Sequence, residues 1–235
     1  SFERIKQMIN SGAEIIDIGG ESTRPGSKTI KEKIEWKRVE NVLKKFKKKF
    51  NKTCLSFDTR KSDLMIRGIK HGVDLINDVS GFKYNTNSLT KIKKFKIGKV
   101  FHHMQGTPNT MQINPKYQNV LLDIYDFFEK NIEKNLNDRK IILDPGIGFG
   151  KTLKHNLTLI SKISLFHSLG FLILVGTSRK RFINQISGIN DSNDRTGGTL
   201  ASVLYLLSQG VQIFRVHNVN EIKQGILVFK KILLN

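Results

Sequence analysis

The chain has 235 residues, with 40 Lys and Arg against 20 Asp and Glu, so its formal net charge is +20. Hydrophobic residues make up 38% of the sequence and aromatic residues 9%, which is enough for a core and excludes a disordered basic tail. The single cysteine, Cys54, excludes a disulfide framework and a cysteine-based zinc cluster. No apolar run reaches the ~18 residues of a membrane span. We therefore expect a cytoplasmic protein without a membrane partner.

The high positive charge raises the question of a nucleic-acid partner. The densest lysine run lies within 31–50, where apolar residues recur at three to five positions: Ile34, Val39, Leu43, Phe46 and Phe50. This spacing predicts an amphipathic helix whose lysines form the solvated face. Residues 91–99 repeat the pattern. A polyanion-binding surface is the alternative, but no helix-turn-helix, zinc-finger or RRM signature accompanies the charge, and we expect no nucleic-acid partner.

In chain order, a helical segment at 1–12 is followed by short apolar runs that alternate with longer helical segments. The runs are rich in Ile, Val, Leu and Phe and lie at 14–20, 53–59, 73–79, 98–104, 140–146, 171–178 and 211–217. The helical segments between them include 31–50, 61–72, 123–136, 155–170 and 196–210. Short apolar strands that alternate with helices predict a parallel sheet of an α/β protein, buried on both faces.

The number of elements favours one particular architecture. Seven strands and eight helical segments are present, and a helix comes first, whereas a closed (β/α)8 barrel has eight of each and starts with a strand. We predict a single TIM barrel domain over 1–235 whose first β-strand and its loop are missing from this chain. The start at Ser1 rather than Met agrees with this expectation. An open doubly wound sheet is the alternative.

Polar residues stand at the end of nearly every predicted strand. They are Asp17 and Glu21, Asp58 and Arg60, Asn77 and Asp78, His102 and His103, Asp144, Ser178 to Lys180, and Arg215 and His217. Charged groups are costly in a strand layer unless they are paired, and barrel enzymes place their sites at the carboxyl ends of the strands. Seven such strand ends in one chain predict an enzyme.

The types of these residues indicate the substrate. Arg24, Lys180, Arg215 and His217 suit phosphate oxygens, which accept charge-assisted hydrogen bonds. Asp58, Asn77 and Asp144 offer acceptors for the N–H edge of an aminopyrimidine-like ring. A phosphorylated, nitrogen-rich heterocycle fits both groups.

The glycine-rich stretch 146–152, GIGFGKT, resembles a phosphate loop but does not match one. A Walker A motif needs Gly five residues before Gly150, where this chain has Pro145, and the glycine spacing does not fit GxGxxG either. We expect these glycines to turn the backbone sharply above the strands. His102 and His103 end a strand, but they lack partners at a known metal-ligand spacing.

Taken together, the motifs resemble the dihydropteroate synthase family of folate biosynthesis. The matching segments occur in family order: IIDIGGESTRPGS at 15–27, SFDTRK at 56–61, INDVSG at 76–81, HHMQGTPNTMQ at 102–112, ILDPGIGFGKTLKHN at 142–156, VGTSRKRFI at 175–183 and FRVHNV at 214–219. They span nearly the whole chain. The resemblance implies a TIM barrel that condenses 6-hydroxymethyl-7,8-dihydropterin diphosphate with p-aminobenzoate and releases pyrophosphate.

The resemblance also implies roles for individual residues. The pterin would be held by Asp58, Asn77, Asp144 and Lys180, and the diphosphate by Arg215 and His217. Thr23, Arg24 and Pro25 would belong to a mobile loop at the p-aminobenzoate pocket, with Phe149 and the Lys180 stem as walls. Catalysis would rest on Lys180, Arg215, His217 and Asp58.

The family further implies Mg²⁺ as cofactor and a homodimer, whose interface could use the helices near 196–210 and the C-terminus. The family's Mg²⁺-binding Asn and one pocket wall lie on an opening strand that this sequence lacks, so we expect no metal ligand in this chain. Arg181 replaces a Ser of some members. The alternatives are a degenerate or truncated non-catalytic paralogue and a pterin-binding methyltransferase domain. GGESTRPG, SRK and RVH argue against the methyltransferase, because a methyl donor carries no diphosphate.

Overall fold

The computed structural model describes residues 2–134 and 140–234. The described residues form seven parallel strands that pair in sequential order, each with the next along the chain. The strands are β1 (Ile15–Gly19), β2 (Cys54–Asp58), β3 (Leu75–Asp78), β4 (Gly98–His102), β5 (Ile141–Asp144), β6 (Leu172–Val175) and β7 (Ile213–Phe214). All seven predicted strands are confirmed.

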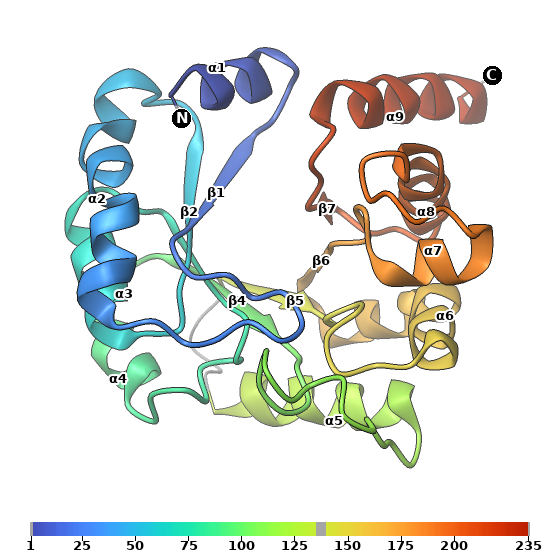
Figure 1. Ribbon diagram of the computed structural model, residues 1–235, viewed down its shortest axis with the longest axis horizontal. Coiled ribbons are helices and arrows are strands. Elements are labelled where there is room, and N and C mark those ends of the chain that lie inside the picture. Colours follow the sequence, from blue (N-terminus) through green and yellow to red (C-terminus); the bar gives the residue numbers. More distant parts are fainter. Residues whose placement is uncertain (1, 135–139, 235) are drawn as a thin grey trace.

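The sequential strand order distinguishes a barrel from a doubly wound sheet, because a doubly wound sheet reverses direction at a switch point. The strands curl and the helices surround them, as in the TIM-barrel fold (Figure 1). Among the described residues, β1 and β7 do not pair with each other. In Figure 1, helices α1 (Phe2–Asn10) and α9 (Val219–Leu233) stand on the two sides of the interval between these strands. A strand in this interval stays a prediction.

The remaining described helices lie between the strands. They are α2 (Glu32–Lys49), α3 (Ser62–Lys70), α4 (Ser88–Ile92), α5 (Val120–Glu133), α6 (Leu153–Ser161), the 3-10 helix η1 (Ile163–Leu169), α7 (Arg181–Ser187) and α8 (Thr196–Ser208). The segment 155–170, predicted as one helix, is divided at Lys162 into α6 and η1. The start of α5 lies three residues before the predicted one, because the Asn119 side chain accepts hydrogen bonds from Leu121 N and Leu122 N. None of the described helices combines the length and apolarity that crossing a membrane requires.

The predicted helical pattern over 91–99 is wrong. Helix α4 ends at Ile92, and strand β4 begins at Gly98, where it pairs with Leu75 of β3. A Cβ at Gly98 would approach Leu75 Cδ1 to 2.7 Å, so the two strands meet closely at this glycine. Residues 93–97 instead form the connection between α4 and β4, and the last two positions of the lysine pattern fall within the strand predicted from 98.

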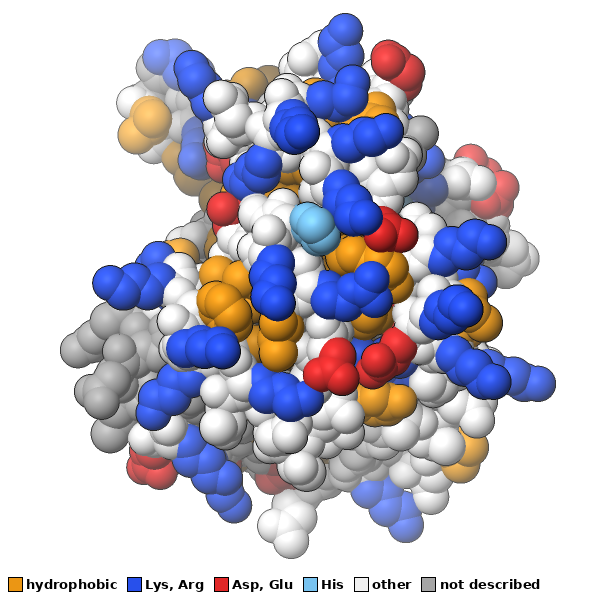
Figure 2. Space-filling model, turned by 90° about the vertical axis from the view of Figure 1, so that its left-hand side faces the viewer, with side chains coloured by type: hydrophobic (Ala, Val, Ile, Leu, Met, Phe, Trp, Pro, Cys, Tyr) orange, Lys and Arg blue, Asp and Glu red, His pale blue; other side chains and the backbone are white. Residues whose placement is uncertain are grey.

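The lysine face predicted for 31–50 is confirmed. Lys44, Lys45, Lys48 and Lys49 of α2 are all exposed, and Figure 2 shows Lys and Arg side chains spread over this side of the molecule. The apolar side of α2 differs at one position from the prediction. Ile34 is 46% exposed, whereas Trp36 is only 4% exposed and packs against the ring of His71.

Alternate side chains of each strand face opposite sides, and this alternation builds two different cores. The outward side chains of β2 to β6 pack against the helices in the large apolar core, with Leu55, Phe57, Ile76, Phe101, Leu143 and Ile173 among them. Inside the barrel each of the seven strands contributes one residue to a small apolar layer: Ile15, Cys54, Leu75, Val100, Ile142, Leu174 and Ile213. Cys54 is half-buried there.

Candidate active site

The site begins two residues beyond the inner apolar layer, where the same alternation turns the next side chains inward. The residues at these positions are Asp17, Ser56, Asn77, His102, Asp144, Gly176 and Arg215. Each strand therefore changes from an apolar to a polar or glycine inner position within two residues. This change places the polar layer at the carboxyl ends of the strands, where barrel enzymes have their sites.

Asp17 of β1 connects three strands through its carboxylate. Its Oδ1 accepts a hydrogen bond from Ser56 Oγ at 2.6 Å, and its Oδ2 accepts one from Asn77 Nδ2 at 2.9 Å. Arg215, which follows β7, extends its side chain into the same layer. Its guanidinium is 3.5 Å from Asp17 Oδ2 and 3.7 Å from Asp144 Oδ2. Gly176 lies directly beside this side chain, since a Cβ built there would be in ordinary van der Waals contact with Arg215 Nε at 3.4 Å.

The charged groups in and beside this layer shift each other's pKa values. Burial disfavours the charged guanidinium, but Asp144, Asp17 and Asp58 outweigh it and raise the pKa of Arg215. For Asp58 the influences that disfavour the charged form are the stronger ones. Burial, and after it the charge of Asp17, raise the pKa of Asp58 well above its usual range. The site thus combines a fixed cation with a carboxyl group that holds its proton more tightly than usual.

Three buried acceptor atoms in this layer have no hydrogen-bond partner among the described residues: Asn77 Oδ1, His102 Nε2 and Asp144 Oδ2. Burial, the largest influence, lowers the pKa of His102 to about 3, so its ring is neutral. His102 Nδ1 lies 2.9 Å from the carbonyl oxygen of Val79 and must donate to it, which leaves Nε2 as a bare acceptor. Buried acceptors without donors are costly. A ligand with several N–H groups on one edge would satisfy them.

The glycine-rich turn 146–150 forms one wall above this layer. Gly146, Gly148 and Gly150 all have positive φ, which confirms the predicted sharp turn. A Cβ at Gly148 would lie 3.0 Å from Lys180 Cδ, so the turn packs directly against this lysine. Lys180 Nζ donates to the carbonyl of Ile147 and stands 4.6 Å from the centre of the Phe149 ring.

Burial, and then the charge of Arg215, lower the pKa of Lys180 to about 7. Next to it, Arg179 has a φ of 61°, a left-handed conformation that is unusual for a residue with a side chain. Its guanidinium donates to Asn218 Oδ1 at 2.8 Å, and Ser178 Oγ lies 2.9 Å from His217 Nδ1. Burial, followed by the charge of Arg179, lowers the pKa of His217. Two loops, after β6 and after β7, are thus joined at the rim.

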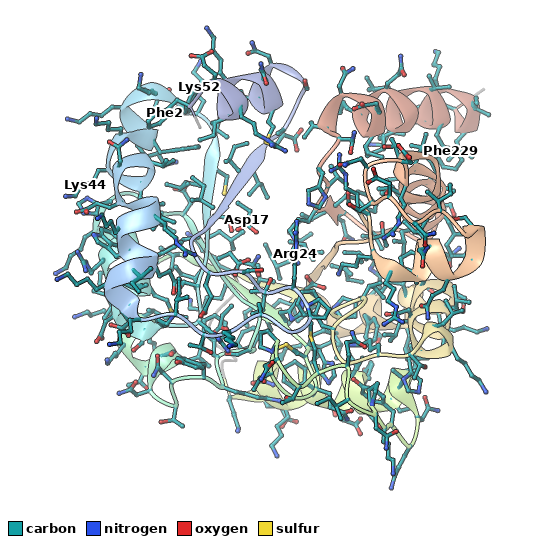
Figure 3. All side chains as sticks on the ribbon, viewed as in Figure 1. Phe2, Asp17, Arg24, Lys44, Lys52 and Phe229 are labelled. Carbon is teal, nitrogen blue, oxygen red and sulfur yellow. The ribbon has the colours of Figure 1, made fainter. Side chains whose placement is uncertain are left out.

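The loops above the polar layer, together with Gly19 and Asp58 at two strand ends, border a cavity of about 1110 Å³. Of the residues predicted for the site, seven line it directly: Thr23, Arg24, Pro25, Asp58, Phe149, Lys180 and His217. Arg181 lines it as well. The other three predicted residues, Asn77, Asp144 and Arg215, do not line this cavity but belong to the polar layer, where Asn77 and Arg215 contact Asp17 and Arg215 also contacts Asp144. Figure 3 shows the labelled Asp17 and Arg24 inside the ring of helices.

Sequence reasoning did not assign a role to three residues of this arrangement, namely Asp17, Ser56 and His102. A signal for them exists in the sequence, because each stands two positions after an inward apolar residue of its strand. Lys151 was also missed. It is buried, and its Nζ donates to the carbonyl of Phe149 at 2.9 Å and lies 3.1 Å from His103 Nδ1. Burial lowers the pKa of Lys151 well below its usual range.

Comparison with known proteins places this site in a family. The model of a family described as pterin binding enzyme matches residues 1–217. The dihydropteroate synthase of Escherichia coli (strain K12) is 36% identical over 225 residues, which cover 94% of this chain and 79% of that protein.

Solved structures of dihydropteroate synthases are also similar to this chain. That of Yersinia pestis dihydropteroate synthase with a sulfonamide drug complex superimposes with a TM-score of 0.95 at 34% identity, covering 100% of this chain and 86% of the other. The Thermus thermophilus enzyme in complex with 4-aminobenzoate gives a TM-score of 0.88 at 32% identity, covering 98% and 89%. The fold and site therefore define a pterin-binding enzyme built on a TIM barrel. Within that class, the chain belongs to the dihydropteroate synthase family.

Proposed function

We propose that this chain condenses 6-hydroxymethyl-7,8-dihydropterin diphosphate with p-aminobenzoate, giving 7,8-dihydropteroate and pyrophosphate. The observation that carries this proposal is a set of three acceptors that have no hydrogen-bond donor among the described residues, Asn77 Oδ1, His102 Nε2 and Asp144 Oδ2, in a buried layer next to Arg215. The aminopyrimidine edge of a pterin presents adjacent N–H donors, which match this set. Membership of the dihydropteroate synthase family supports the same substrates.

The pterin would occupy the polar layer. Asp144 would accept from the guanidine-like N–H groups of the ring, because its Oδ1 already accepts from Gly146 N, while its Oδ2 has no hydrogen-bond donor in the described part of the chain. Asn77 and Asp58 would contact the opposite part of the ring. Lys180 would approach the ring oxygen and nitrogen from above, where Gly148 leaves room for its stem.

The diphosphate would lie toward Arg215 and His217. In the proposed reaction, the bond between the exocyclic carbon of the pterin and the diphosphate oxygen breaks first. The electron pair leaves with pyrophosphate, whose charge the nearby cations stabilise. The electron-rich pterin spreads the positive charge left on the carbon. The amine of p-aminobenzoate then forms the new C–N bond and loses one proton to solvent, so that it needs orientation more than deprotonation.

The p-aminobenzoate would bind between the loop with Thr23, Arg24 and Pro25 and the wall formed by Phe149 and the Lys180 stem. All five residues line the cavity. The Thermus thermophilus relative in complex with 4-aminobenzoate supports this substrate. Arg181 at the same rim adds a cation where the benzoate carboxylate would emerge.

Mg²⁺ is the proposed cofactor, and when bound it would neutralise charge on the leaving pyrophosphate. The residues 2–134 and 140–234 contain no group of three His, Cys, Asp or Glu side chains placed to hold a metal ion. The described side chains alone therefore do not form a complete site for this ion.

We also propose that the chain acts as one catalytic domain in a cytoplasmic homodimer. The single cysteine and the biosynthetic reaction support the compartment. The outer face of α9 supports the dimer, because Leu227 is 58% exposed and Ile232 67% exposed. Light scattering on the purified protein checks this state, and Leu227→Glu should yield monomers. A monomeric wild-type protein would contradict the homodimer.

The reaction is tested by pyrophosphate release from the two substrates, each omitted in turn as a control. We expect release only with both present, and Lys180→Ala should lower the rate at least ~100-fold, the size of losing a key electrostatic contact. Lys44→Ala removes an exposed cation of α2 and is the matched control. Absence of release from the wild-type protein, or near-normal turnover of Lys180→Ala, would contradict the assignment.

A further inference from the structure

The loop 21–30, which carries Thr23, Arg24 and Pro25 over the cavity, is closed at its base by one carboxylate. Glu21 Oε1 accepts a hydrogen bond from Ile30 N at 2.8 Å, which joins the two ends of the loop. Glu21 Oε2 accepts from Arg60 Nε at 3.0 Å and from Lys61 Nζ at 3.2 Å. These two cations follow β2, so the carboxylate ties the loop to the barrel. We call Glu21, Arg60 and Lys61 the loop clamp.

Arg60 makes further contacts that a simple ion pair would not need. Its second nitrogen, NH2, donates to Thr29 Oγ1 at 2.8 Å, and its guanidinium stacks over the Tyr84 ring at 4.5 Å. Arg60 therefore contacts both ends of the loop, Glu21 at the start and Thr29 near the end. The planar guanidinium directs these N–H groups from two different nitrogen atoms in a fixed geometry, whereas a lysine would donate from a single nitrogen atom.

The loop clamp is buried, and its charges are balanced. The side chains of Glu21 and Arg60 are each 6% exposed and that of Lys61 is 3% exposed. Lys61 Nζ also donates to Glu35 of α2, whose side chain is fully buried. Two carboxylates thus face two cations. Buried charges persist only when paired, and removing one partner leaves the others uncompensated. The clamp therefore has a defined geometry rather than the variable one of exposed ion pairs.

Beyond the clamp, the loop has few attachments. Ser22, Arg24, Pro25, Gly26 and Lys28 are exposed, and the tip is joined to the rest of the barrel by the hydrogen bond from Gly26 N to the Pro108 carbonyl at 3.0 Å. Because the contacts at the base of the loop are stronger than the contact at its tip, the base determines the orientation of the loop. The position of Arg24 and Pro25 over the cavity thus depends on Arg60, which itself does not line the cavity.

We propose that Arg60 is a positioning residue, which acts through Glu21 and Thr29 to hold loop 21–30 over the cavity in the conformation that binds the second substrate. This inference rests on the proposed function, because it takes p-aminobenzoate as the ligand of that loop. The side-chain hydrogen bonds of Arg60 go to Glu21 and Thr29, neither of which belongs to the polar layer that would hold the pterin. The two substrates should therefore respond differently when the clamp is weakened.

The kinetic test compares Arg60→Lys, Arg60→Met and Thr29→Val with the wild-type protein. Thr29→Val removes one hydrogen bond with little change of shape. Arg60→Lys keeps the charge but loses the two separate nitrogen donors that contact Glu21 and Thr29. We expect the KM for p-aminobenzoate to rise ~10-fold in Arg60→Lys, somewhat less in Thr29→Val and more in Arg60→Met, since tenfold corresponds to about one charge-assisted hydrogen bond. The Kd of the pterin diphosphate, measured without the second substrate, should stay within ~2-fold.

A second measurement reports on the loop without using activity. Lys28 is the exposed trypsin site of the loop that is not followed by proline. Limited trypsin digestion with mass spectrometry should show faster cleavage after Lys28 in the Arg60 and Thr29 variants, because a weakened base opens more often. Lys44→Ala, which breaks an exposed ion pair on α2, should change neither cleavage after Lys28 nor either substrate constant.

The outcomes separate this inference from the proposed function. Faster cleavage together with a raised KM for p-aminobenzoate alone supports the positioning role. An active enzyme whose KM values stay unchanged in the variants overturns it, and so does an equal loss for both substrates, which would indicate general destabilisation. If the wild-type protein releases no pyrophosphate, the proposed function fails, whereas unchanged cleavage after Lys28 would overturn the clamp itself.

Discussion

His102 and Asp144 face each other with two acceptor atoms, His102 Nε2 and Asp144 Oδ2, which lie 3.9 Å apart in the buried layer of the barrel. Neither atom has a hydrogen-bond donor among the described residues. The neutral ring of His102 cannot supply one, because its only N–H donates to Val79. Two acceptors held this close by the pairing of β4 with β5 fit a ligand that brings adjacent N–H groups.

Asp144→Asn tests this relationship. The amide would turn an N–H group toward the N–H groups of the pterin, or leave a single neutral acceptor where a carboxylate stood. We expect turnover to fall at least ~100-fold and the Kd of the dihydropterin to rise at least ~10-fold. Calorimetric titration with the dihydropterin checks the affinity. Asp63→Asn, at an exposed ion pair with Lys91, is the control and should bind normally. Unchanged pterin affinity in Asp144→Asn would refute this orientation of the ring.

The pH profile should report on Lys180. Burial, and after it the charge of Arg215, lower the pKa of Lys180 to about 7 in the protein without ligand. The ammonium form binds an anionic substrate, and this form is lost as pH rises through that value. We expect kcat/KM for the pterin diphosphate to be level below pH ~7 and to fall up to tenfold per pH unit above it.

Lys180→Arg provides the comparison, because arginine stays charged throughout this range. The variant should be slower than the wild-type protein, but the decline above neutral pH should disappear from its profile. A decline that persists in Lys180→Arg would assign the titration to another group.

The outer core should control stability without controlling chemistry. Phe128 of α5 is fully buried and meets Phe166 edge to face, with 5.5 Å between the ring centres. Phe128→Ala would leave a cavity between α5 and η1, and we expect the free energy of unfolding to fall by about 3–5 kcal/mol. Urea unfolding measures this loss. At low temperature, the folded variant should keep its substrate KM values, and a selective change in one KM would show that this core reaches the site.

The loop clamp should make stability sensitive to acid. Burial would raise the pKa of Glu21, but hydrogen bonds from Arg60 and Ile30 and the charges of Arg60 and Lys61 outweigh it and lower that pKa below its ordinary value of 4.5. The carboxylate therefore contributes its full stabilisation above pH 4.5, and this contribution is lost as pH falls from there through the lower pKa of the folded state.

Urea unfolding of Glu21→Gln at several pH values checks this. The variant should be less stable than the wild-type protein at pH ~7, and the difference should shrink below pH ~4.5. Glu40→Gln, at an exposed pair with Lys44, is the control and should show an effect that salt removes. A constant difference between Glu21→Gln and wild type at all pH values would exclude the ionised clamp.

The strands, most of the helices and the family could be predicted from the order of the amino acids alone. Seven apolar runs, each ending in polar residues, predicted the strands and the rim where the site lies, because buried parallel strands are short and apolar throughout. Motifs such as GGESTRPG and DPGIGFGK named the residues of the rim. These features are local in the chain and need no knowledge of which strands are neighbours. The helical pattern at 91–99 was wrong, because α4 ends at Ile92 and the residues after it connect α4 to the strand that begins at Gly98.

The contacts between side chains from distant parts of the chain became visible in the folded structure. Asp17 and His102 each stand two positions after an inward apolar residue, Ile15 and Val100 respectively. Their side chains come together because the seven strands enclose one interior. The contact between Arg215 and Asp17 joins residues 198 positions apart in the chain. The contact of Glu21 with Arg60 joins residues 39 positions apart. Such contacts depend on the curling of the sheet and on burial, which removes water as a competing partner and makes each charge require a specific neighbour.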